Sequence, residues 1–180
     1  MAIDELSTVR SERKWTFAMI GVSAVMLIAI VYAGIGMHMS PPSNIENVDP
    51  NTLHLAGEFV DANLGTHVDV AGKITTRIVA TQFAFQPDCV VVPQNTQVTF
   101  RAVSPDVLHG FIILNTNVNT MVVPGYVSQV RTVFDKTGDM LMPCHEFCGL
   151  GHSQMIAHVR VVPLQDFKPH ENGRVSCAER

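Results

Sequence analysis

Side chains that bind soft metal ions are concentrated in one short stretch of the chain. Cys144, Cys148, His152 and Met155 follow the pattern Cys-x3-Cys-x3-His-x2-Met. Thiolate, imidazole and thioether groups select copper, zinc or iron–sulfur over magnesium or calcium. The thioether narrows this choice, because structural zinc sites take Cys and His but have no use for Met. The set therefore predicts a redox-active copper site.

The presence of two cysteines leaves two kinds of copper site open. One Cys, two His and a Met would form a mononuclear blue-copper site. Two thiolates could instead bridge two copper ions in a flat Cu2S2 core, which needs more outer ligands than the stretch supplies. His109, within an apolar run, is the best candidate for another imidazole, and a backbone carbonyl between the cysteines could complete the set. A zinc knot or a Cys144–Cys148 disulfide would explain neither His109 nor Met155.

Together these residues resemble the dinuclear copper (CuA) motif of cytochrome c oxidase subunit II. The similar text includes Ser-Pro-Asp-Val-Leu-His-Gly at 104–110 and Cys-Gly-Leu-Gly-His at 148–152. With a single predicted membrane helix, the chain looks most like the short subunit II of the B-type haem–copper oxidases. The resemblance covers roughly residues 12–162, and the tail lies outside it.

The resemblance implies a complete ligand set for two copper ions, which the two cysteines bridge. His109 and Met155 would complete one copper. His152 and the backbone carbonyl of Glu146 would complete the other. The Glu146 carboxylate stays free, and in the wider family the equivalent group reaches a magnesium ion shared with the catalytic subunit. Carboxylate oxygen suits magnesium, so Glu146 is also a candidate magnesium ligand.

The same resemblance implies an electron-transfer function. The subunit would accept electrons from a cytochrome c and pass them to haem in the catalytic subunit I, which reduces oxygen to water. The chain has no c-type haem motif, so the oxygen chemistry belongs to the partner. The alternatives are the copper subunit of a nitric oxide reductase and a free-standing membrane-anchored copper carrier. A net charge of −4 excludes a strongly basic nucleic-acid-binding protein.

Further residues are candidates for supporting roles. Apolar surroundings tune the potential of a bound copper, and the candidates for this role are Phe83, Phe85, Phe111 and Phe147. Each of them is also explained as ordinary core. Glu12 resembles an acidic residue just before the membrane helix, near the start of a proton path in B-type oxidases. The alternative for Glu12 is a solvated charge next to the membrane.

An apolar segment at 15–37 is the first element of the chain, and its 23 residues include no charged side chain. That length crosses a bilayer core of about 30 Å as a helix. It exceeds the apolar part of a signal peptide, so we expect an uncleaved anchor in membrane lipid. Basic residues precede it, and the next one is Lys73. The positive-inside rule therefore predicts a cytoplasmic segment 1–14 and a copper domain on the periplasmic face of the inner membrane.

The rest of the chain predicts a mainly β fold. Residues 38–72 lack a clear period and are expected to be a connector, whereas short Val-, Ile- and Phe-rich runs separated by turn residues fill 73–162. This pattern predicts a cupredoxin-like Greek-key β-barrel after the transmembrane helix. The expected strands are 74–85, 89–92, 96–103, 107–114, 118–123, 126–134, 138–143 and 156–162. The polar tail at 163–180 is expected to be ordered only in part.

Two further cysteines lie outside the metal motif. Cys89 opens an apolar run and is interpreted as a small buried hydrophobe. A disulfide between Cys89 and Cys177 of the tail is the alternative, and it would need an oxidising compartment.

The electron donor is expected to dock over the copper loop. The expected apolar centre of this surface is Phe111, Phe147, Leu150 and Met155, and its weakly acidic rim is Asp106, Asp135 and Asp139. Because few carboxylates are available, we expect the donor to associate with only a weak dependence on salt.

Overall fold

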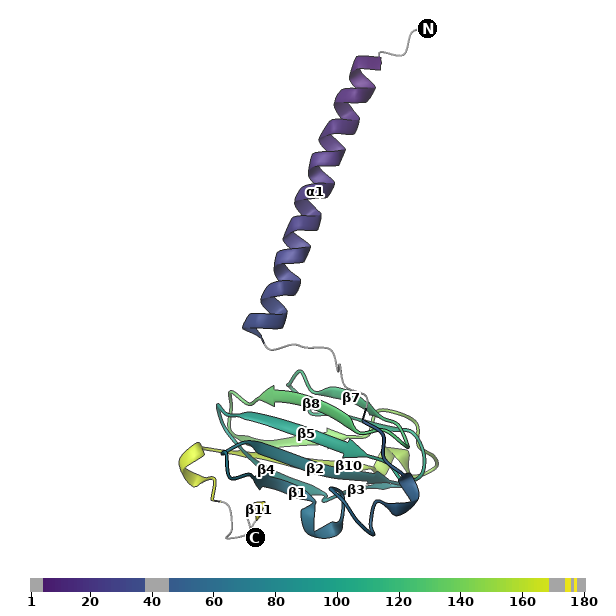
Figure 1. The fold of residues 1–180 in the computed structure, drawn as a ribbon, viewed down its shortest axis with the longest axis vertical. Coiled ribbons are helices and arrows are strands. Elements are labelled where there is room, and N and C mark those ends of the chain that lie inside the picture. The colour runs from purple at the N-terminus through teal and green to yellow at the C-terminus, as the bar shows by residue number, and fades with distance from the viewer. Residues whose placement is uncertain (1–4, 38–45, 169–173, 176, 178–180) are drawn as a thin grey trace. The chain divides into compact units, whose positions relative to one another are not determined.

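The computed structural model describes residues 5–37, 46–168, 174–175 and 177 (Figure 1). The chain divides into two compact units, Met1–Ser43 and Asn44–Arg180. The first contains one long helix, and the second contains the described strands. The start of the expected connector, at 38–45, lies outside the described residues.

The helix α1 runs over Glu5–Gly36. Its segment Thr8–Gly36 is long and apolar enough to span a membrane, and it is the single such segment in the described part of the chain. The helix begins earlier than the apolar segment because Glu, Arg and Lys are good helix formers, so the charged residues continue it. Glu12 therefore lies within α1 rather than just before it.

Short strands make up most of the second unit, as the spacing of its turn residues predicts. The strands are β1 (Gly65–Val68), β2 (Ile74–Thr81), β3 (Ala84–Gln86), β4 (Cys89–Pro93), β5 (Gln97–Val103), β6 (His109–Ile112), β7 (Asn119–Val122), β8 (Ser128–Val133), β9 (Gly138–Pro143), β10 (Ile156–Val162) and β11 (Arg174–Val175). The 3-10 helices are η1 (Pro50–Thr52), η2 (Asp61–Asn63), η3 (His152–Gln154) and η4 (Leu164–Asp166).

The described strands form three sheets. The largest has the order β11-β1-β2-β5-β8, with β3 also paired to β2, and the others are β4-β10-β9 and β6-β7. β2 pairs parallel with β5, and β4 pairs parallel with β10, so connections cross between the sheets. Figure 1 shows the strands layered against one another. The expected mainly β, cupredoxin-like fold is confirmed, although its sheets share a core without closing into one hydrogen-bonded barrel.

Aromatic side chains form the centre of the core between the sheets. Phe100, Phe111 and Phe134 are almost completely buried. The ring of Phe100 lies 6.3 Å from that of Phe111 and 6.2 Å from that of Phe134. Such aromatic pairs add about 0.5–1.5 kcal/mol beyond the burial of their area. Both motif cysteines belong to the same core cluster, so the metal motif is attached directly to a rigid base.

The stretch expected to be a connector, 38–72, builds part of the domain over its described residues. Leu53, Phe59 and Leu64 form a second buried cluster against side chains of β2 and β5. β1 also lies in this stretch and pairs antiparallel with β2. Its sequence, Gly-Thr-His-Val, is short and mixed in polarity and shows no alternating pattern. This strand is therefore defined by its pairing with β2.

The expected strand 74–85 is two strands, because the chain turns at Gln82 and Phe83 between β2 and β3. Neither residue is a typical turn former, so the break has no signal in the sequence. β3 then runs back antiparallel to the end of β2. The turn brings Gln82 and Phe83 to the loop that carries the metal motif, as their contacts with Cys148 and Gly149 show.

The tail contributes to the fold through a strand and a disulfide. β11 pairs antiparallel with β1. Cys177 forms a disulfide with Cys89, and the Cα atoms of the two cysteines are 6.1 Å apart. The interpretation of Cys89 as a small buried hydrophobe is therefore wrong. The two cysteines meet across 88 residues of sequence because the tail returns along β1 to the start of β4. The rest of the tail, apart from η4, lies largely outside the described residues.

Candidate metal centre

The loop with most of the expected ligands, 144–155, joins β9 to β10. These strands pair antiparallel up to the loop, and at its base the Cys144 N–H donates to the Met155 carbonyl oxygen at 2.9 Å. The sheet therefore fixes both ends of the loop. Between the ends, η3 begins at His152 and turns the chain back towards β10.

His109 reaches this loop from a separate strand. It is the first residue of β6, and an antiparallel bridge joins Phe111 of this strand to Cys144. Beside the bridge, the His145 N–H donates to the Gly110 carbonyl oxygen at 3.1 Å. Gly110 leaves room for the His145 ring, because a Cβ at this residue would come within 2.6 Å of it. The pairing thus joins the two sequence-distant parts of the predicted ligand set.

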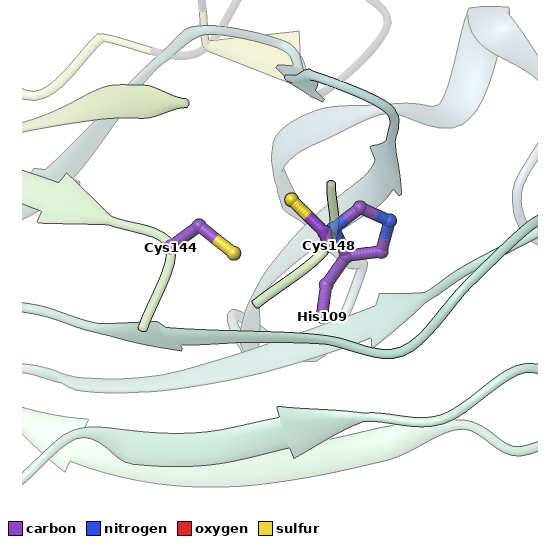
Figure 2. Close-up of side chains that lie close together, drawn as sticks. All are labelled: His109, Cys144 and Cys148. Atoms are coloured by element: carbon purple, nitrogen blue, oxygen red, sulfur yellow. The ribbon is translucent and has the colours of Figure 1, made fainter. Parts of the chain in front are cut away.

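His109, Cys144 and Cys148 form a buried group whose metal-binding atoms all lie within 4.8 Å of one another. Figure 2 shows these three side chains gathered in one place. Both cysteines are free thiols, so the alternative of a disulfide between them is not formed. The sequence predicts this arrangement, in which two thiols lie beside an imidazole from a distant part of the sequence.

The remaining expected ligands surround this group. His152 Nδ1 lies 3.6 Å from Cys148 Sγ, and Met155 Sδ lies 3.7 Å from the same sulfur. The Cys144 thiol donates to the Glu146 carbonyl oxygen at 3.2 Å. The expected donors, including the backbone carbonyl, therefore meet around the two cysteine sulfurs.

The orientation of His109 leaves one ring nitrogen available to a metal. Nε2 lies 2.9 Å from Asp106 Oδ1, and because a carboxylate accepts, Nε2 carries the proton. Nδ1 is buried and has no hydrogen-bond partner among the described residues. A buried unpaired polar atom costs about 1–3 kcal/mol, and a metal at Nδ1 would satisfy it. A carboxylate on the far nitrogen is also how proteins usually orient a metal-binding histidine, so the residues present fit a copper ion.

Two acidic groups at the site, the Asp106 carboxyl and the Cys148 thiol, have pKa values shifted in opposite directions. Burial by itself would raise the pKa of Asp106, but hydrogen bonds from the His109 ring, two backbone N–H groups and the Ser104 hydroxyl lower it overall. Burial and the neighbouring Cys144 raise the pKa of Cys148. Asp106 is therefore an anion at neutral pH, whereas Cys148 keeps its proton until a bound cation displaces it.

The phenylalanines expected around the site fall into two groups. Phe85 and Phe111 belong to the buried core, where packing alone explains them. Phe83 packs so closely against the loop glycines that a side chain added there would collide with its ring. Phe147 is 76% exposed, and its ring centroid lies 5.8 Å from that of His152. Phe83 and Phe147 are thus the two of these four phenylalanines that reach the surface.

Of the acidic rim expected around the loop, Asp106 alone lies beside the site, with its side chain 31% exposed. Asp106 is turned to the His109 ring and accepts its hydrogen bond. Asp135 and Asp139 lie at the opposite end of β9, because the loop follows the last residue of that strand. The loop exposes large apolar side chains as well, with Leu150 completely exposed and Phe147 76% exposed.

Two contacts with the site were missed in the sequence, one from Asp106, which was expected only in the acidic rim, and one from Gln82. Asp106 precedes His109 by three residues. This short spacing is the signal in the sequence that could have identified a carboxylate that orients the histidine. Gln82 donates from its side-chain amide to the Cys148 carbonyl oxygen at 2.5 Å. No sequence signal identifies Gln82, because the contact depends on the turn between β2 and β3.

Comparisons with known proteins agree with this geometry. A model of the family described as cytochrome C oxidase subunit II, periplasmic domain, matches residues 69–162. A cytochrome c oxidase subunit 2 from Thermus thermophilus is 33% identical over 153 residues, which is 83% of this chain and 90% of the relative. Another from the same species is 36% identical over 121 residues, 67% of this chain and 90% of the relative.

A solved structure is similar over most of the chain as well. One chain in the cryo-EM structure of a heme-copper terminal oxidase dimer aligns with a TM-score of 0.64 and 28% sequence identity. The alignment covers 85% of this chain and 99% of the other, so it includes more than the β-domain.

Proposed function

The chain belongs to the cytochrome c oxidase subunit II family, and from this membership we propose that it is the subunit through which electrons reach a haem–copper terminal oxidase. Its partner is the catalytic subunit I of that complex, where oxygen is reduced to water. The chain is membrane-anchored through α1 and binds copper in its β-domain. It is therefore an oxidoreductase subunit that transfers electrons and does not itself bind oxygen.

The proposed copper site is dinuclear. Cys144 and Cys148 would bridge the two ions, with His109 and Met155 completing one and His152 the other. The Glu146 carbonyl oxygen would supply the last ligand. A dinuclear copper takes up and releases one electron at a time. The observation that carries this proposal is the convergence of these donors around two free, buried thiols, beside a buried histidine nitrogen without a partner.

The chain's own contribution is rigidity. β9 and β10 hold the two ends of the loop, and the bridge from Phe111 to Cys144 ties the loop to β6. Because the donors are attached to a closely packed core, they can move little when the charge of the site changes. Little movement means that little energy is needed to reorganise the site at each electron transfer.

We expect the electron donor to be a cytochrome c that docks on an apolar surface formed by Phe83, Phe147 and Leu150. Phe111 and Met155, which were also expected in this surface, are almost completely buried and cannot belong to it. The exposed fractions of Phe83, Phe147 and Leu150 are 38%, 76% and 100%. Weak electron-transfer contacts use small surfaces of this kind. A small contact also keeps the complex weak, which lets the donor leave after each electron.

We propose that the N-terminus is cytoplasmic and that the copper domain is periplasmic. Arg10, Arg13 and Lys14 precede the apolar part of α1, and the next basic residue is Lys73, which fits the positive-inside rule. The disulfide between Cys89 and Cys177 supports the same orientation, because disulfides persist in oxidising compartments such as the periplasm. A membrane-impermeant label that reached the domain only from the cytoplasmic face would contradict this orientation.

Two acidic groups have further proposed roles in the assembled oxidase. The Glu146 carboxylate is 37% exposed and would be a magnesium ligand at the interface with subunit I. Glu12, in the first part of α1, would lie near the start of a proton path. Glu146→Gln should lower the magnesium content of the complex, and Glu12→Gln should slow proton uptake without changing the copper spectrum.

Metal analysis and electron paramagnetic resonance test the central proposal. The copper-loaded chain should hold two coppers and give the spectrum of a mixed-valence pair, and one copper with a single-ion spectrum would contradict it. A fragment beginning at Asn44, the start of the compact unit, should fold and load copper in the same way. Co-purification with a haem subunit that consumes oxygen, and not nitric oxide, tests the role in the complex.

A further inference from the structure

Gln82 contacts two parts of the candidate site that come from different segments of the chain. It lies in the turn between β2 and β3. Its backbone N–H donates to Asp106 Oδ2 at 2.7 Å, and its side-chain amide donates to the Cys148 carbonyl oxygen at 2.5 Å. One residue thus holds both the carboxylate beside His109 and the backbone of a cysteine in the loop.

The contact with Asp106 fixes the direction of the His109 ring. Asp106 Oδ1 accepts from His109 Nε2 at 2.9 Å and from the Val107 N–H at 2.6 Å, while Oδ2 accepts from Gln82. Because both oxygens are engaged, the carboxylate cannot rotate without breaking hydrogen bonds. The position of His109 Nδ1, the nitrogen available to a metal, therefore depends in part on Gln82.

The contact with Cys148 fixes a part of the loop that β6 does not hold. Cys144 is held to the strand of His109 by a backbone bridge, and Cys148 lies beyond that bridge. The chain then turns at Gly149, whose φ is +133°. A Cβ on Gly149 would come within 3.0 Å of the Gln82 amide nitrogen, so the absence of a side chain permits this contact.

We infer that Gln82 is a positioning residue that fixes the separation of the His109 and Cys148 ligands, and that it thereby raises copper affinity and makes the pair uniform. This inference rests on the proposed copper site. Gln82 is not among the proposed ligands, and it acts through Asp106 and the Cys148 backbone. Losing a hydrogen bond that orients a metal ligand typically lowers metal affinity or activity about 10–100-fold.

The test compares Gln82→Met with the control Gln94→Met in the full chain. Methionine keeps the length of glutamine and removes the amide that donates to the Cys148 carbonyl oxygen, while the backbone N–H to Asp106 remains, so the variant tests the side-chain contact. Gln94 also donates from its amide to a backbone carbonyl, that of Asp135, at 2.9 Å, but its contact lies at the end of β9 away from the loop. Gln82→Glu is a second variant, because it keeps the shape and sets a carboxylate against the Cys148 carbonyl.

Three measurements give the expected result. In the copper-free chain, hydrogen exchange across 144–155 should be faster in Gln82→Met, by roughly 10-fold, and unchanged in Gln94→Met. Competition with a chelator should show a copper affinity lower by about 10–100-fold in Gln82→Met, and at least as low in Gln82→Glu. In the copper-loaded chain, the paramagnetic resonance lines of both Gln82 variants should broaden, because ligand separation varies between molecules.

The outcomes separate this inference from the proposal on which it rests. Unchanged exchange, affinity and spectra in Gln82→Met would overturn the inference, and so would equal changes in Gln94→Met, which would indicate a general loss of stability. If the wild-type chain binds a single copper, the dinuclear proposal fails. The exchange measurement on the copper-free chain still decides in that case whether Gln82 holds the loop.

Discussion

The chain contains two pairs of cysteines with opposite chemistry. Cys144 and Cys148 are free and buried, whereas Cys89 and Cys177 form a disulfide. The free pair lies in one loop on the core. The bonded pair joins the half-buried start of β4 to the tail, across 88 residues of sequence. Pairing by proximity in sequence would therefore bond the wrong pair.

The difference between the pairs lies in the atoms around the sulfurs. An imidazole, a thioether and a backbone carbonyl surround the free thiols, and these are groups that can share a metal with them. The other pair ties two segments together, which is what a disulfide does well. The chain must therefore keep one pair reduced where the other is oxidised. We expect factors that reduce and metallate Cys144 and Cys148 to act before these thiols oxidise.

Cys148→Ser should break the free pair and have the largest effect. A serine hydroxyl cannot bridge copper as a thiolate does, so the mixed-valence pair should disappear and the copper content should fall below two. Copper analysis and paramagnetic resonance measure this change. Cys177→Ser is the matched control, and a loss of the pair in that variant would show that the two cysteine pairs are not independent.

Replacing the bonded pair should change stability and leave the copper spectrum intact. The double variant with Cys89→Ser and Cys177→Ser loses a cross-link across a long loop, which typically costs about 2–5 kcal/mol. Urea unfolding of the copper-free chain measures the loss in the free energy of unfolding. An unchanged unfolding midpoint would mean that the disulfide does not stabilise the domain.

Asp106→Asn sharpens the comparison, because it changes a neighbour of the free pair and leaves both sulfurs in place. An amide carries no charge and has one oxygen, so it cannot accept from both the His109 ring and the Gln82 N–H as the carboxylate does. Copper affinity should fall about 10–100-fold with two coppers still bound at saturation. Asp139→Asn, at the far end of β9, is the control and should leave the affinity unchanged.

The smallest expected effect is the influence of salt on the donor. Because Asp135 and Asp139 lie at the far end of β9 and Leu150 is completely exposed, apolar contact should dominate docking. Stopped-flow measurements of electron transfer should therefore show a rate that changes only a few-fold between low and physiological salt. Leu150→Ala should slow association more than the change in salt does. A fall by orders of magnitude with salt would instead indicate docking by charge.

The sequence predicts the loop ligands well because Cys144, Cys148, His152 and Met155 lie within one short turn-rich segment. His109 could be named only as the best remaining candidate, since strand pairing between β6 and the loop is what brings it to the cysteines. Apolar runs indicated most strands, but β1 and β11 depend on partners and not on their own pattern. The disulfide and the contacts of Gln82 depend on how distant segments meet, which local patterns do not specify.

β11 has a consequence for how copies of this protein meet one another. Its pairing of Val175 with Thr66 and of Arg174 with His67 covers the edge of β1 that faces away from β2. An uncovered strand edge offers free N–H and carbonyl groups to the same edge of another molecule, which is a route to aggregation. The disulfide at Cys177 keeps this short strand in place. We therefore expect the tail, which carries no part of the metal motif, to reduce self-association through this edge of the sheet.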